Sequence, residues 1–88
     1  MKTICLGGDF YVSENKIMEI FPYRTNMAKR FVSGMKGIPN AVHDCTGRRS
    51  TASVVVLMGE SGLQVILSPL TPKTLVKRMF ANENHEKR

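Results

Sequence analysis

The strongest constraint on the fold is an apolar run that does not alternate with polar residues, Ser53-Val54-Val55-Val56-Leu57-Met58. The run is rich in β-branched residues, and a Gly-Glu-Ser-Gly segment at 59–62 separates it from a second extended segment at 63–67. The two segments predict a β-hairpin. A strand that is apolar on both faces needs a covering layer on each side. Because the chain has only 88 residues, we expect one of these layers to come from a neighbouring subunit.

A helix with a basic outer face is predicted between the strands. Apolar residues recur at helical spacing over residues 25–36, Thr25 or Asn26 can cap the first turn, and Gly37 can end the last one. A second helix is expected to begin at Thr71-Pro72, with an apolar stripe made by Leu75, Val76, Met79 and Phe80.

Further strands are expected at residues 3–6, 10–12 and 17–21, with a short one at 41–42. This order predicts an α+β domain, built from a small, mostly antiparallel sheet and two amphipathic helices. The domain is expected to cover residues 1–80, followed by a flexible polar tail at 81–88.

A chain of this length is expected to need support beyond its own core. Such a domain buries only about 60% of the surface that its unfolded chain exposes. The sequence has two cysteines, Cys5 and Cys45, and no signal-like segment, which argues against structural disulfides as this support. No apolar run approaches the ~18 residues of a membrane span. We therefore expect a cytoplasmic protein that associates with itself.

Positive charge is concentrated in the middle of the chain. Residues 1–23 carry two lysines against three acids, a net charge of −1, and residues 50–88 carry five cations against three glutamates, a net charge of +2. Residues 24–49 carry six cations against Asp44 alone, a net charge of +5. Concentrated charge of one sign predicts a polyanionic partner, such as nucleic acid or an anionic membrane surface.

The clearest candidate for contact with such a partner is Gly47-Arg48-Arg49. A glycine allows a sharp turn, and two adjacent guanidinium groups can then reach phosphates or guanine edges, because each binds them bidentately. Exposed cations on the predicted first helix, Lys29, Arg30 and Lys36, would add contacts to the phosphate backbone. Each of these side chains can also be read as an ordinary solvated residue.

Catalytic and metal-binding chemistry finds little support in the sequence. His43-Asp44-Cys45 holds a histidine and a cysteine two residues apart, but no third orienting group is evident. The paired cysteine spacing of structural zinc sites is missing. Gly7-Gly8-Asp9 lacks the pattern of a phosphate-binding loop and reads as a turn. We expect no enzyme, no cofactor, no metal and no small-molecule substrate.

Three segments taken in order make the chain similar to a known family. They are Val12-Ser13-Glu14-Asn15-Lys16-Ile17, Gly47-Arg48-Arg49-Ser50, and residues 66–75, which begin Ile66-Leu67-Ser68-Pro69. The chain resembles the RemA/RemB family of bacterial extracellular-matrix (biofilm) regulators over roughly residues 4–79. The resemblance implies a DNA-binding transcriptional regulator that assembles into a ring of about seven or eight subunits.

The resemblance also implies which residues bind DNA. The family's arginine pair corresponds to Arg48 and Arg49, and a third family arginine corresponds to Lys16, which keeps the charge without the bidentate geometry. Together with the cations of residues 24–36, the predicted set for double-stranded DNA is Arg48, Arg49, Lys16, Arg30, Lys29 and Arg24. The alternative is an interaction or assembly module whose basic patch binds an acidic protein or an anionic membrane.

Overall fold

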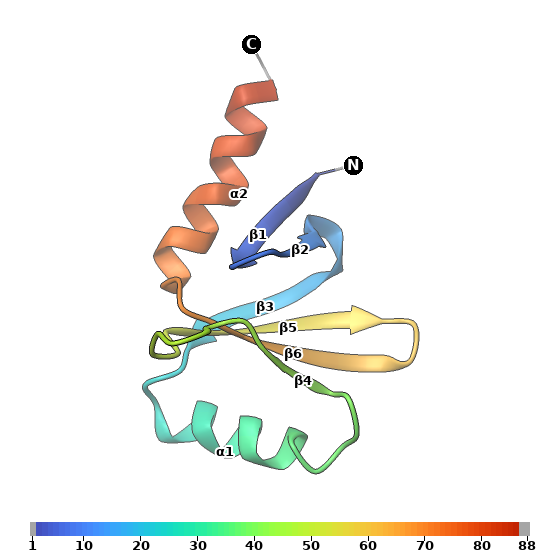
Figure 1. Cartoon of the computed structure of the whole chain (residues 1–88). Coiled ribbons are helices and arrows are strands. Elements are labelled where there is room, and N and C mark those ends of the chain that lie inside the picture. The colour runs from blue at the N-terminus through green and yellow to red at the C-terminus, as the bar shows by residue number, and fades with distance from the viewer. Residues whose placement is uncertain (1, 87–88) are drawn as a thin grey trace.

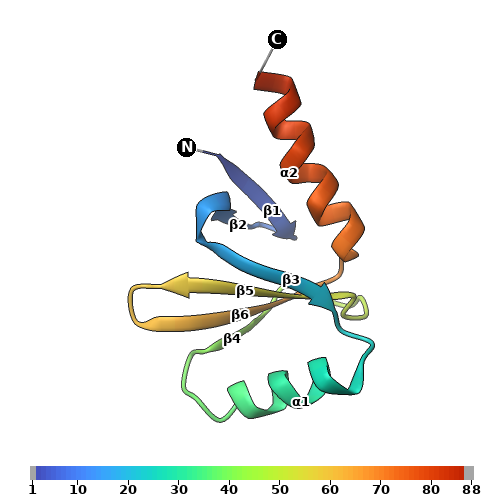
Figure 2. The ribbon, with the colours of Figure 1, turned by 180° about the vertical axis from the view of Figure 1, so that it is seen from behind.

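A computed structural model describes the backbone of residues 2–86 and the side chains of residues 2–80. The chain forms three layers (Figure 1). A four-stranded sheet lies in the middle, helix α1 (Asn26–Met35) covers one of its faces, and the other face is covered by a two-stranded sheet and helix α2 (Pro72–Glu86). The same three layers are seen from behind in Figure 2.

The four-stranded sheet has the order β3-β5-β6-β4. Strand β5 (Ser53–Gly59) and strand β6 (Gly62–Ser68) form the hairpin that the sequence predicts, and their tip is closed by the Gly59–Gly62 pair. Strand β3 (Ile17–Pro22) joins β5 in antiparallel pairing, whereas strand β4 (Val42–Asp44) joins β6 in parallel pairing. Strands β3 and β4 are therefore the two edges of this sheet.

Strand β5 is covered on both faces by its own chain. Val55 and Leu57 pack with Ile4, Leu6 and Leu75 on one side of the sheet. Val54 and Val56 pack with residues of α1 on the other side, where Ala28 and Val32 are buried. The expectation that a neighbouring subunit supplies one of these layers is wrong, because α1 and the N-terminal strands supply both.

The predicted fold class is also wrong. Instead of one small sheet in an α+β domain, strands dominate the structure and divide between two sheets. Strand β1 (Thr3–Gly7) and strand β2 (Phe10–Ser13) pair with each other, and a single 3-10 turn, η1 (Glu14–Lys16), leads from β2 into β3. The local pattern identifies these strands but not their partners, because pairing is set by packing between distant segments.

Helix α1 follows the prediction closely. The Thr25 hydroxyl caps it by accepting a hydrogen bond from the Ala28 backbone N–H at 3.1 Å. In α2, Leu75 is fully buried, whereas Val76 and Phe80 are exposed, so the predicted apolar stripe packs only in part. The α2 backbone continues past residue 80 to Glu86. The tail predicted at 81–88 lies outside the side chains that the structure describes.

Candidate nucleic-acid interface

The loop that carries Arg48 and Arg49 connects β4 to β5 at one end of the four-stranded sheet. Its first residue, Cys45, donates its backbone N–H to the Leu67 carbonyl at 2.9 Å. Near its end, Ala52 donates to the Ser68 carbonyl at 2.8 Å. Both ends are thus fixed to β6, and residues 47–50 form a short exposed segment between them.

A tight turn presents the two arginines. The Arg49 N–H donates to the Thr46 carbonyl at 3.0 Å, and Gly47, the first central residue, has a φ of +64°. A positive φ at this position alone is typical of a type II′ turn, which favours glycine there. Thr46 is buried, whereas the side chains of Arg48 and Arg49 are exposed. The turn therefore holds two guanidinium groups at the surface on a fixed backbone.

Asp44 holds the first residue of this turn. Its Oδ1 accepts hydrogen bonds from the Thr46 N–H at 2.8 Å and the Thr46 hydroxyl at 2.5 Å. These two bonds lower the pKa of the Asp44 carboxyl, and the charge of Lys36 lowers it further. Sequence reasoning missed this role, although an aspartate two residues before a donor is the signal of such a side-chain turn.

Two further predicted cations lie at the same end of the sheet. Pro22, the last residue of β3, pairs with Ser53, and Tyr23 donates its N–H to the Ala52 carbonyl at 3.1 Å. Arg24 follows directly and is exposed. The Lys29 ammonium lies 5.9 Å from the centre of the Tyr23 ring, a cation–π distance. Arg24 and Lys29 thus join the end of the molecule that carries Arg48 and Arg49.

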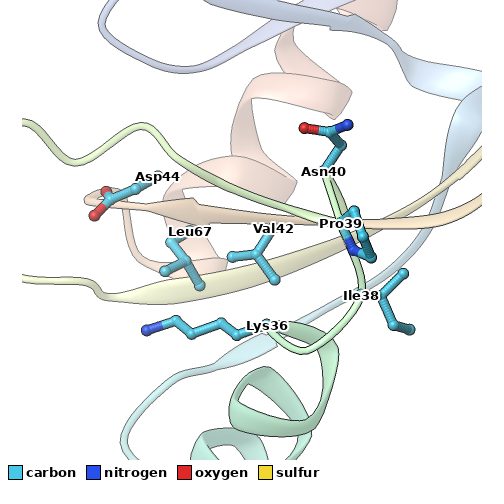
Figure 3. Close-up of a pocket in the computed structure, with 7 residues that line it drawn as sticks. All are labelled: Lys36, Ile38, Pro39, Asn40, Val42, Asp44 and Leu67. Carbon is cyan, nitrogen blue, oxygen red and sulfur yellow. The ribbon is translucent and has the colours of Figure 1, made fainter.

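The other two helix cations lie differently. Arg30 is exposed and two positions from both Ala28 and Val32, which face the sheet, so it projects away from the sheet at 100° per residue. Lys36 follows α1 and lines a shallow pocket of about 280 Å³ that Asp44 also lines (Figure 3). These cations belong to the flank of α1 and not to the turn itself.

Lys16 lies at the opposite end of the sheet. It is the last residue of η1, and the next residue, Ile17, pairs with Leu57. The loop that carries Arg48 and Arg49 enters β5 at its other end, at Ser53. Four residues of strand separate these positions, which is roughly 14 Å. One subunit therefore does not bring Lys16 together with Arg48 and Arg49.

The histidine and cysteine of β4 and the loop do not form an activated pair. The His43 ring packs against Phe10, with 6.1 Å between ring centroids. Burial raises the pKa of the Cys45 thiol, and the charge of Asp44 raises it further, so the reactive thiolate is disfavoured. Within the described residues, no three metal-binding side chains come together. Nor does either helix there combine the length and apolar character needed to cross a membrane.

Fold and surface together define a small domain of two sheets and two helices that presents paired arginines on a rigid turn. The chain matches the model of the RemA-like family, extracellular matrix regulatory protein A-like, over residues 3–79, and it belongs to that family. It is also 34% identical to a Finegoldia magna protein named "Putative regulatory protein", over 98% of this chain and 99% of the relative. Both comparisons support a regulatory role.

Proposed function

We propose that this protein is an oligomeric, double-stranded DNA-binding regulator of transcription that controls extracellular-matrix genes in the cytoplasm. The proposal rests chiefly on the turn at residues 46–49, which holds two exposed arginines at the same end of the sheet as Arg24 and Lys29. Membership of a family described as extracellular matrix regulatory protein A-like supports the matrix-regulatory part of the proposal. The protein acts by binding and not by catalysis, and the raised pKa of the partly buried Cys45 thiol supports this interpretation.

Phosphate contacts dominate the proposed binding. Guanidinium groups bind phosphate oxygens bidentately. Because Arg48 and Arg49 project from the same turn, they can bind neighbouring phosphates. Arg30 supports them from the outer face of α1. Lys16 can contact the same duplex if the duplex runs along β5. The distance from Lys16 to the arginine pair along the strand is shorter than one helical repeat of DNA, so both can reach phosphates of the same turn of the duplex.

Self-association follows from the small number of cations in each subunit. A few phosphate contacts give weak, salt-sensitive affinity. Linked copies of the turn make each later contact effectively intramolecular, which raises the overall affinity without a new kind of contact. We therefore propose a homo-oligomer as the DNA-binding form.

The test is fluorescence anisotropy of labelled duplex DNA, titrated with protein over a series of salt concentrations. We expect the Arg48→Ala/Arg49→Ala double variant to bind about 100-fold more weakly or worse, since each charge-assisted hydrogen bond contributes about 1.5–3 kcal/mol. The matched control is Lys73→Ala/Lys77→Ala, which removes two exposed charges from α2. We expect this control to bind nearly as tightly as the wild type.

Two results would overturn the DNA proposal. One is equal loss of binding in both double variants, which would show that net charge alone matters. The other is no binding by the wild type even at low salt. In the second case, titration with vesicles containing phosphatidylserine would show whether the basic surface binds an anionic membrane instead.

A further inference from the structure

Four hydroxyl side chains lie within residues 46–53, all of which the structure describes, and one of them is exposed. The hydroxyls of Thr46 and Ser53 are buried and donate hydrogen bonds within the chain. Thr51 is half-buried, whereas Ser50 is exposed. Ser50 is therefore the hydroxyl of this loop that an enzyme can reach.

The backbone around Ser50 does not depend on its side chain. The turn before it is closed by the bond from the Arg49 N–H to the Thr46 carbonyl, and the chain after it is fixed by the bond from the Ala52 N–H to the Ser68 carbonyl. Among the described residues, the Ser50 hydroxyl has no hydrogen-bond partner. A group added to this hydroxyl thus leaves the loop in place.

The sequence before Ser50 is strongly basic. Its two preceding residues are Arg48 and Arg49, and both are exposed. Protein kinases select a hydroxyl partly by the charges beside it, and those with acidic substrate grooves favour arginines before the acceptor. Exposed loops are also the segments that modifying enzymes can reach. Arg48-Arg49-Ser50 therefore combines an accessible acceptor with the charge pattern that such a kinase recognises.

We propose that Ser50 is a phosphorylation site for a serine/threonine protein kinase that recognises basic segments, and that its modification prevents DNA binding. The Ser50 oxygen forms a bond to the γ-phosphorus of ATP, the bond from that phosphorus to the β–γ bridging oxygen breaks, and ADP leaves. The hydroxyl proton passes to a carboxylate of the kinase. The inference rests on the proposed DNA-binding function and identifies how it is regulated.

A phosphate on Ser50 acts through its charge. It carries about −1.5 to −2 at neutral pH, which cancels most of the charge that Arg48 and Arg49 bring to the loop. Because both guanidinium groups belong to the two preceding residues, the phosphate can accept charge-assisted hydrogen bonds from them. These are the donors that the proposed function assigns to DNA phosphates.

The attached phosphate has an advantage over DNA in this competition. Its contact with the arginines is intramolecular, so it does not depend on the concentration of a partner. It also repels the phosphates of an approaching duplex, since like charges disfavour contact. The loss of affinity should therefore equal or exceed that of Arg48→Ala/Arg49→Ala, which removes the same two contacts without adding repulsion.

The anisotropy titration tests the effect on binding, with phosphoserine installed at position 50 during translation. The matched control carries phosphoserine at position 61, because Ser61 is exposed in the β5–β6 turn, at the opposite end of the hairpin from the arginine loop (Figure 1). We expect the first protein to bind DNA about 100-fold more weakly than the wild type, or worse. We expect the control to lose less than tenfold, and Ser50→Ala to bind as the wild type does.

Tandem mass spectrometry of the protein isolated from its native cells tests the modification itself. We expect phosphate on Ser50. Its absence from Ser50, or its presence on Thr51 alone, would overturn the proposal. Equal loss of DNA binding with phosphoserine at positions 50 and 61 would also overturn it, because net charge would then explain the effect. An unmodified wild type that binds no DNA would refute the proposed function, while phosphate found on Ser50 would leave the modification site standing.

Discussion

The carboxylate of Asp44 accepts two hydrogen bonds from Thr46, one from the backbone N–H at 2.8 Å and one from the hydroxyl at 2.5 Å. Thr46 in turn accepts the bond from Arg49 that closes the turn. An acidic side chain therefore fixes the backbone that presents two basic ones. The same contact makes the stability of the loop depend on the ionisation of one carboxyl group.

Loss of this carboxylate should destabilise the protein at neutral pH but not in acid. We expect Asp44→Ala to lower the free energy of unfolding by about 1 kcal/mol at pH 7, as two hydrogen bonds at an exposed site imply. The folded pKa of Asp44 lies below its ordinary value of 3.8. Its stabilisation is therefore present above that value and is lost as pH falls through the folded pKa.

Urea unfolding at pH 7 and at pH 3 or below measures this difference. Asp44→Asn is the control, since it keeps an acceptor oxygen and removes the charge. A gap between wild type and Asp44→Ala that stays constant across this range would contradict the role given to the carboxylate.

Glycine-to-alanine changes at two positions should have opposite effects on the stability of the fold. Gly47→Ala places a Cβ at a φ of +64° with open space around it, so the cost is backbone strain of about 1–2 kcal/mol. Gly34 is exposed within α1 with open space around its Cβ position, and alanine there should stabilise the helix by about 0.5–1 kcal/mol. Thermal unfolding should show a lower melting temperature for Gly47→Ala and a higher one for Gly34→Ala than for the wild type. Equal effects would argue against the turn geometry.

The contribution of Lys16 to DNA binding should be smaller than that of the arginine pair. We expect Lys16→Ala to weaken binding less than tenfold and to reduce the salt slope by about one, as loss of one phosphate contact does. Lys16→Arg should retain the wild-type slope. The measurement is the same anisotropy titration, and a loss equal to that of Arg48→Ala/Arg49→Ala would show that the two ends act as one site.

Two neighbouring residues of α2 should respond very differently to truncation. Leu75 is fully buried against the sheets, so Leu75→Ala should cost about 2–5 kcal/mol. Val76 is exposed, so Val76→Ala should change stability by less than about 0.5 kcal/mol. Urea unfolding of both variants compares them directly. Similar costs at the two positions would mean that α2 packs in another orientation.

Local patterns predicted the local features of this fold. The sequence patterns located each of the six strands, although the short one predicted at 41–42 overlaps β4 only at Val42. The recurrence of Ala28 and Val32 located α1, and Thr25 was among the predicted caps. Each of these features depends on residues close together in the sequence. For the same reason, the glycine and two arginines at 47–49 were predicted as an exposed turn.

Features set by distant contacts could not be read from the sequence. The two sheets meet through contacts between distant segments, such as that of Gly7, where an added Cβ would lie 2.7 Å from Pro69 Cδ. The parallel pairing of β4 with β6 also joins segments far apart in the chain. Lys16 was grouped with Arg48 and Arg49 through a family resemblance, and its place at the far end of β5 follows only from strand register.

The burial of β5 by its own chain has a consequence for how the protein is made. Leu75, a fully buried residue that covers it, belongs to α2. A nascent chain can therefore complete its core only after residue 75 has left the ribosome, but it needs no second chain to do so. We therefore expect the stability of the folded domain not to depend on the concentration of the protein.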